Sequence, residues 1–215
     1  MKTMIRTLMG LGLVAIIAGP AAAQGRGGFG RGGMAQLLGN ESVQKELKLN
    51  DQQVEKAKEL SEKMSEKARE ARQSAQDLEG EERMKKMREA MAEIHTETVK
   101  EAGEFLKPEQ LTRLKQISYQ ASGARAFNDP EVARKLNLTE DQKTAIHEIE
   151  QEANEERRSI FQDNQGDREA IMKKMGELNK QTLAKIEGKL NDEQKKTWTG
   201  LIGSHFDVVY PPRNN

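Results

Sequence analysis

The chain has 215 residues, with 35 Lys plus Arg, 35 Asp plus Glu and no Cys. This balanced charge argues against a dedicated nucleic-acid binder, which needs a basic footprint, and the lack of Cys excludes a disulfide-held fold and thiol chemistry. Charged residues make up 33% of the chain and aromatic residues only 4%, which favours long, solvent-exposed helices with narrow apolar seams over one large core.

The N-terminus has the pattern of a cleavable signal peptide over residues 1–23. Lys2 and Arg6 precede the apolar stretch Leu8–Ala18, and Ala21–Ala23 forms an A-x-A cleavage site. The apolar stretch is shorter than a membrane-spanning helix, although an uncleaved N-terminal anchor is the alternative. The pattern predicts a periplasmic or otherwise secreted protein with no transmembrane span after cleavage.

A Gly/Arg-rich segment over residues 24–35 follows the predicted cleavage site. Glycine at this density disfavours helix and strand, so we expect a flexible leader. An RGG-type RNA-binding tail is the alternative reading, but predicted export argues against it. No nucleic-acid partner is therefore expected.

The rest of the chain is an internal duplication. Leu38–Gln53 aligns without a gap to Phe127–Gln142, and Leu106–Gln110 matches Leu190–Gln194. A repeat of this period indicates two copies of one supersecondary unit. The predicted segments are the signal peptide 1–23, the leader 24–35, unit 1 over 36–122, unit 2 over 123–205 and a C-terminal tail over 206–215.

Apolar residues recur every three or four positions in each unit, which predicts helices. In unit 1 the pattern predicts long helices from about residue 51 to 77 and from about 82 to 105. Short turns at Leu78–Gly80 and Asn164–Gly166 would make each pair antiparallel. The expected fold is all-α: two tandem units of long antiparallel helical hairpins with short flanking helices, packed like coiled coils.

Four pentapeptides of the form LxxxQ stand where helices should begin. Asn or Thr at the second position can cap the helix, and Gln at the fifth can reach back to the N–H of the cap residue, which closes a capping box. Lys107 cannot cap, although Pro108 suits the first helical position. The residues assigned to this structural motif are Leu49, Asn50, Gln53, Leu106, Gln110, Leu138, Thr139, Gln142, Leu190, Asn191 and Gln194.

This motif resembles that of the LTxxQ family of periplasmic proteins typified by Spy and CpxP, most closely at Leu136–Lys143. The resemblance implies a thin cradle of helical hairpins. It also implies an ATP-independent chaperone or envelope-stress modulator that binds unfolded or envelope proteins, and metal binding in some relatives. A metal-responsive zinc or copper protein and a structural cell-envelope protein are the alternatives.

Methionine beside basic residues near each hairpin turn suggests a surface that binds client proteins, although packing within the seam would explain the methionines equally well. The candidate residues are Met84, Lys85, Lys86, Met87, Arg88, Met91, Met172, Lys173, Lys174 and Met175.

No motif supports catalysis, a cofactor or a metal site. The sequence has neither a Gly-rich phosphate loop nor an HExxH motif, and its three His residues have no helical pairing. We therefore expect a binding protein and not an enzyme. Covalent joining of the two units predicts a monomer in which they pair as a pseudo-dimer, with a homodimer as the alternative.

Overall fold

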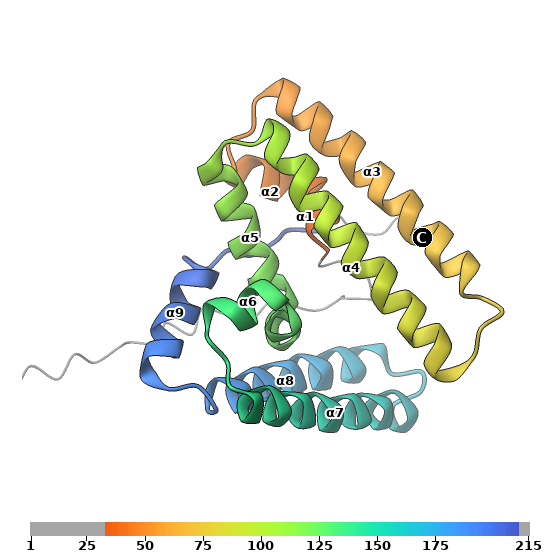
Figure 1. Ribbon diagram of the computed structural model, residues 1–215. Coiled ribbons are helices and arrows are strands. Elements are labelled where there is room, and N and C mark those ends of the chain that lie inside the picture. Colours follow the sequence, from red (N-terminus) through yellow and green to blue (C-terminus); the bar gives the residue numbers. More distant parts are fainter. Residues whose placement is uncertain (1–32, 211–215) are drawn as a thin grey trace, which may run out of the picture.

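The computed structural model describes residues 33–210, and this part of the chain is all-α (Figure 1). The predicted signal peptide, most of the predicted leader and residues 211–215 lie outside the described residues, so export stays a prediction. Within the described range, no helix is long and apolar enough to cross a membrane. The elements are α1 (Met34–Leu38), α2 (Glu41–Glu46), α3 (Asp51–Ser74), α4 (Gly80–Phe105), α5 (Pro108–Ser122), the 3-10 helix η1 (Gly123–Asn128), α6 (Pro130–Lys135), α7 (Glu140–Asp163), α8 (Arg168–Glu187) and α9 (Asp192–Ile202).

Two long antiparallel hairpins dominate the structure: α3 with α4, and α7 with α8. Their buried residues recur at helical spacing, as at Ala57, Leu60 and Met64 on α3. The turns lie close to the predicted ones, since α4 begins at Gly80 and α8 begins just after Gly166. Both glycines have a positive φ, of 54° and 91°, which a residue with a side chain rarely adopts.

Each unit has its own apolar core at the base of its hairpin. In unit 1, α1 and α2 pack beneath α3 and α4 and bury Leu37, Leu38 and Val43 completely. In unit 2, η1 and α6 take the same place, where the rings of Phe127 and Trp198 lie 4.4 Å apart. The short helices therefore pack at the base of each hairpin, and its tip extends beyond them.

The turn before each long hairpin is also repeated. Lys48 and Asn137 occupy matching positions and both have left-handed backbone, with φ of 52° and 48°. The following N–H groups, of Leu49 and Leu138, donate to the carbonyls of Gln44 and Ala133 five residues back. This is the hydrogen bond of a Schellman helix end, and it turns the chain sharply into the next helix.

The two units meet mainly through α5 and α9, and their hairpins start near opposite ends of α5 and extend to the same side of the molecule in this view (Figure 1). Lys115 on α5 lies 2.8 Å from Glu131 on α6, and this ion pair links the units. His95 on α4 lies 3.8 Å from Asp129, which caps α6. Within one chain the units thus pack mainly through short elements near the hairpin bases, with a further contact from the middle of α4. That the protein is a monomer stays a prediction.

Candidate functional site

The glutamines of the four LxxxQ pentapeptides pair across each hairpin base, two by two. In unit 1, Gln53 Nε2 donates to Gln110 Oε1 at 2.8 Å, and Gln110 Nε2 donates to the carbonyl of Leu47 at 3.0 Å. In unit 2, Gln142 Nε2 donates to Gln194 Oε1 at 2.8 Å, and Gln194 Nε2 donates to the carbonyl of Leu136 at 3.1 Å. Each pair fastens the start of one helix to the start of another.

The same glutamines also cap their own helices. At Asn50, Thr139 and Asn191 the side-chain oxygen accepts from the N–H three residues on, and that residue's amide oxygen accepts the N–H of the cap. At Lys107 only half of this arrangement exists: its N–H donates to Gln110 Oε1 at 2.9 Å, because an ammonium cannot accept a hydrogen bond. These residues therefore cap the helices and join their starts.

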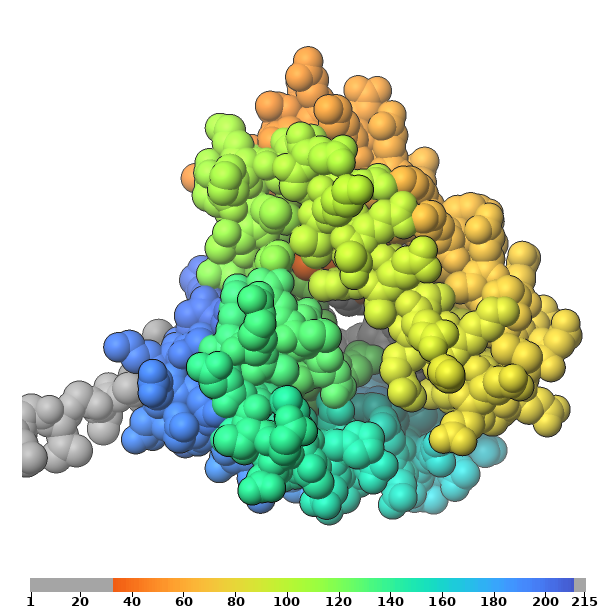
Figure 2. All heavy atoms as spheres, viewed as in Figure 1, coloured from red at the N-terminus to blue at the C-terminus, as the bar shows by residue number. Residues whose placement is uncertain are grey.

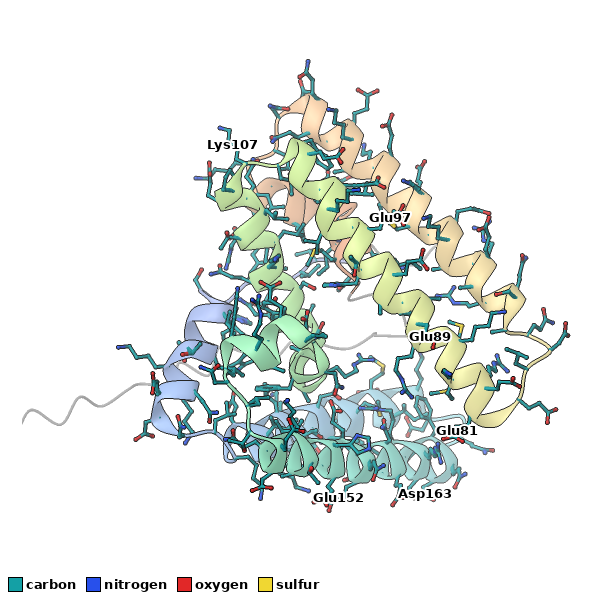
Figure 3. The ribbon with its side chains drawn as sticks, viewed as in Figure 1. Glu81, Glu89, Glu97, Lys107, Glu152 and Asp163 are labelled. Carbon is teal, nitrogen blue, oxygen red and sulfur yellow. The ribbon has the colours of Figure 1, made fainter. Side chains whose placement is uncertain are left out.

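The seam of the unit-1 hairpin opens towards its tip. On α4 it begins with the fully buried Ala102 and Thr98 and continues through the half-buried Ile94. Nearer the tip, Met91 is 37% exposed and Met84 is 59% exposed. Glu97, Glu89 and Glu81 follow α4 from its middle to this tip (Figure 3).

We attribute this opening to small side chains on α3. Ala68 and Ala71 continue the α3 seam beyond the buried Met64, and alanine does not reach far enough to cover a methionine on the neighbouring helix. We call the resulting apolar area the tip surface, and it consists of Ala68, Ala71, Met84, Met87 and Met91. In the space-filling view the unit-1 hairpin projects away from α5 and the surface is hollowed between α4 and unit 2 (Figure 2).

The matching seam of unit 2 is closed. Where the repeat places Ala71 and Ile94 in unit 1, unit 2 has Ile160 and Leu178, which are 7% and 4% exposed. With Ala153 these residues form a separate small core, against which Ile171 and Met175 pack. The candidate Met175 therefore packs against this core while half-buried, and Met172 is half-buried as well. The seam of unit 2 is therefore packed where the seam of unit 1 is open, although Phe161 on the outside of unit 2 is 51% exposed.

Two of the candidate lysines serve the hairpin turns. Lys86 Nζ donates to the carbonyl of Ser74, the last residue of α3, at 2.9 Å. Lys174 Nζ donates to Asn164 Oδ1 at 2.9 Å across the turn of unit 2. Lys85, Arg88 and Lys173 are exposed. The structure therefore brings Lys85 and Arg88 beside the tip surface and assigns the lysines at the turns to the fold.

Ion pairs join the helices of the unit-1 hairpin below the tip surface. Glu97 on α4 pairs with Lys67 and Lys63 on α3. Hydrogen bonds from Lys67 and then Lys63 lower the pKa of Glu97 from its ordinary 4.5 to about 2. The carboxylate thus stays ionised and holds the hairpin together laterally. Among the described residues, no group of three or more His, Cys, Asp or Glu could hold a metal ion.

Sequence reasoning missed a further contact, made by the segment that follows α9. Residues 204–210 return to unit 1, where Phe206 and Val208 pack against the unit-1 core. The sequence assigns residues 204–205 to unit 2 and residues 206–210 to a tail, because no local pattern shows that two apolar residues belong to a core formed far earlier in the chain.

The comparison with known proteins identifies a family. Residues 1–116 match the family model described as the TraM recognition site of TraD and TraG. This match covers more than half of the chain, and the chain therefore belongs to that family. The matched region contains the whole unit-1 hairpin with its tip surface and ends before unit 2. No curated protein and no solved structure matches the chain.

This family overturns the functional interpretation drawn from LxxxQ. The assignment to the LTxxQ family of Spy and CpxP is wrong, and so are the periplasmic stress chaperone and the metal-responsive and structural envelope proteins that were its alternatives. Binding of unfolded proteins is not supported either. The physical reason is that LxxxQ meets a general need of helix starts, so it reports local capping chemistry and not descent.

Proposed function

We propose that this chain is a protein-recognition module that binds a TraM-like partner through the tip surface of unit 1, and that it acts by binding and not by catalysis. One observation carries the proposal. Ile160 and Leu178 bury the unit-2 seam, with Phe161 exposed outside it, whereas Met84 and Met91 of the unit-1 seam are exposed. A family described by its recognition of a protein partner matches the half that contains the open tip.

The chemistry of the tip surface suits a protein partner. Methionine is flexible and polarizable, so it adapts to the shape of an apolar side chain placed on it. Lys85 and Arg88 are exposed beside the methionines and can attract carboxylates on the partner. An exposed apolar area with charged neighbours is a common form of protein-binding site. Affinity should therefore fall with salt but not vanish.

The test uses purified TraM as the probe and a matched pair of variants of the full chain. Met84→Ser changes the most exposed methionine of the open tip, and Phe161→Ser changes a residue of unit 2 that is 51% exposed. Neither change touches a buried core. We expect Met84→Ser to weaken binding about tenfold, in the range of an interface hot spot, and Phe161→Ser to leave it unchanged.

Two results would overturn parts of this proposal separately. If the unaltered chain does not bind TraM, the partner is wrong. If the unaltered chain binds TraM but both variants bind it with the same affinity, or both variants lose affinity equally, the tip surface is not the contact. A titration against immobilised TraM at two salt concentrations measures the affinity of each chain and its dependence on salt.

A further inference from the structure

Residues 204–210, which we call the strap, lie on unit 1 like a bound peptide. Phe206 and Val208 pack against the unit-1 core, whereas His205, Asp207 and Val209 are exposed. This alternation with a period of two is that of an extended chain with one face buried. On the outer face, His205 Nε2 lies 3.1 Å from Asp207 Oδ1.

Side chains of unit 1 form hydrogen bonds with the backbone of the strap at both of its ends. The Gln120 amide accepts the N–H of Phe206 at 2.9 Å and donates to the carbonyl of Ser204 at 2.8 Å. Arg113 Nη1 donates to the same carbonyl at 2.8 Å. These bonds hold the first half of the strap at α5, and the guanidinium of Arg113 lies 6.0 Å from the ring centre of Phe206.

The other end of the strap is held at α2. Asn40, which caps α2, donates from Nδ2 to the carbonyl of Val209 at 2.9 Å. Ser42 Oγ accepts the N–H of Val209 at 3.0 Å. Unit 1 thus supplies donors and acceptors for an extended backbone and an apolar surface for two side chains. We call these unit-1 residues the seat, namely Asn40, Ser42, Arg113 and Gln120.

We propose that the seat is a binding site for an extended peptide with an aromatic and a β-branched aliphatic residue two positions apart, and that the strap is its built-in occupant. Receptors for extended peptides work in this way, with affinity from backbone hydrogen bonds and specificity from pockets for alternate side chains. The seat meets both conditions, because the polar contacts are to the strap backbone and the half-buried side chains that pack on the unit-1 core are Phe206 and Val208. This site is separate from the tip surface and does not depend on TraM binding.

The strap is attached to the chain by a tight joint. Gly203 has a φ of 61°, and a Cβ placed there would lie 2.4 Å from atoms of the Gln116 side chain. Because the backbone of Gly203, with φ of 61° and ψ of −157°, strongly disfavours a side chain, we expect Gly203→Ala to strain the joint and displace the strap while Phe206 and Val208 remain intact. This gives a second way to empty the seat that does not alter the apolar anchors.

The experiment adds a fluorescent peptide with the sequence of residues 204–210 to full-length chains. In the unaltered protein the tethered strap competes at an effective concentration of about millimolar, so the peptide should bind weakly. In Phe206→Ala/Val208→Ala the strap loses its anchors, and we expect at least about tenfold tighter binding of the peptide. The matched control, His205→Ala/Asp207→Ala, changes only the outer face and should bind as weakly as the unaltered protein. Fluorescence anisotropy measures the three affinities.

Circular dichroism first establishes that each variant keeps its helicity, and Gly203→Ala replaces the double variant if that one unfolds. A peptide in which both anchors are Ala should not bind any of the chains. Equal peptide binding by all of them, or no saturable binding by both strap-released variants, would overturn the proposal. Peptide binding that is equally tight when Met84→Ser is added to Phe206→Ala/Val208→Ala would show that this site stands independently of the tip surface.

Discussion

Gln53 and Gln110 exchange side-chain hydrogen bonds, with Gln53 Nε2 to Gln110 Oε1 at 2.8 Å and Gln110 Nε2 to Gln53 Oε1 at 3.3 Å. They lie at the starts of α3 and α5, and each also accepts the N–H of its own cap residue. Because both amides are buried and fully bonded, the pair acts as a clasp at the base of unit 1. Gln142 and Gln194 repeat it in unit 2.

Removing one half of this clasp should cost more than an ordinary surface change. Gln110→Ala leaves the carbonyl of Leu47 and the amide of Gln53 without their buried partner, and we expect a loss of about 1–3 kcal/mol in the free energy of unfolding. Gln52→Ala, at an exposed neighbouring position, should change it by less than about 0.5 kcal/mol. Urea denaturation measures both, and equal midpoints would contradict the role assigned to Gln110.

The left-handed residue before α3 offers a stabilising change. Lys48 has a φ of 52°, a conformation that costs a side-chain-bearing residue about 1 kcal/mol, so Lys48→Gly should raise stability by part of that amount. Asn tolerates this conformation, and Asn137→Gly in unit 2 should gain less. Thermal melts of the two variants test which one gains more stability. A lower melting temperature for Lys48→Gly than for the unaltered chain would refute the prediction.

The incomplete cap of α5 can be completed. Lys107 has the extended backbone of a cap residue but no acceptor, whereas Asn50, Thr139 and Asn191 have one. Lys107→Asn should therefore stabilise the chain by about 1 kcal/mol, the usual value of an N-cap. Lys107→Ala is the control and should have little effect. Chemical denaturation that finds the two variants alike would show that Asn does not cap α5.

Acid should loosen the contact between the units. Burial alone would raise the pKa of Glu131, but hydrogen bonds from Lys115 and Lys135 outweigh it and lower the pKa from 4.5 to about 2. Because the folded pKa is below the unfolded value, ionised Glu131 stabilises the fold above about pH 4.5, and this contribution is lost as the pH falls towards 2. Glu131→Gln should therefore flatten the fall in unfolding free energy over this range.

The control for this pH dependence is Glu156→Gln, at an exposed position of α7. It should keep the acid-induced fall of the unaltered chain. Denaturant titrations at about pH 6, 4 and 2.5 compare the unfolding free energies of the two variants as the carboxylates become protonated. A Glu131→Gln chain that loses as much stability as the control would contradict the inter-unit role of the Lys115–Glu131 pair.

The all-α fold and its two hairpins could be predicted, because helix period, capping residues and glycine turns are local signals. The start of α3 at Asp51 and the end of α4 at Phe105 follow from them directly. The pairing of Gln53 with Gln110 could not be predicted, since capping already explained each Gln alone. The exposure of Met84 could not be predicted either, because Met84 and the half-buried Met175 look alike in the sequence until the facing helix is known.

The place of the strap has a consequence for how the polypeptide matures. Phe206 and Val208 come near the end of the chain, yet they complete a core whose other members begin at Met34. Closing a contact over so long a stretch is entropically slow compared with forming a hairpin. During synthesis unit 1 therefore emerges first but is finished last, and until translation has passed Val208 its seat stays uncovered.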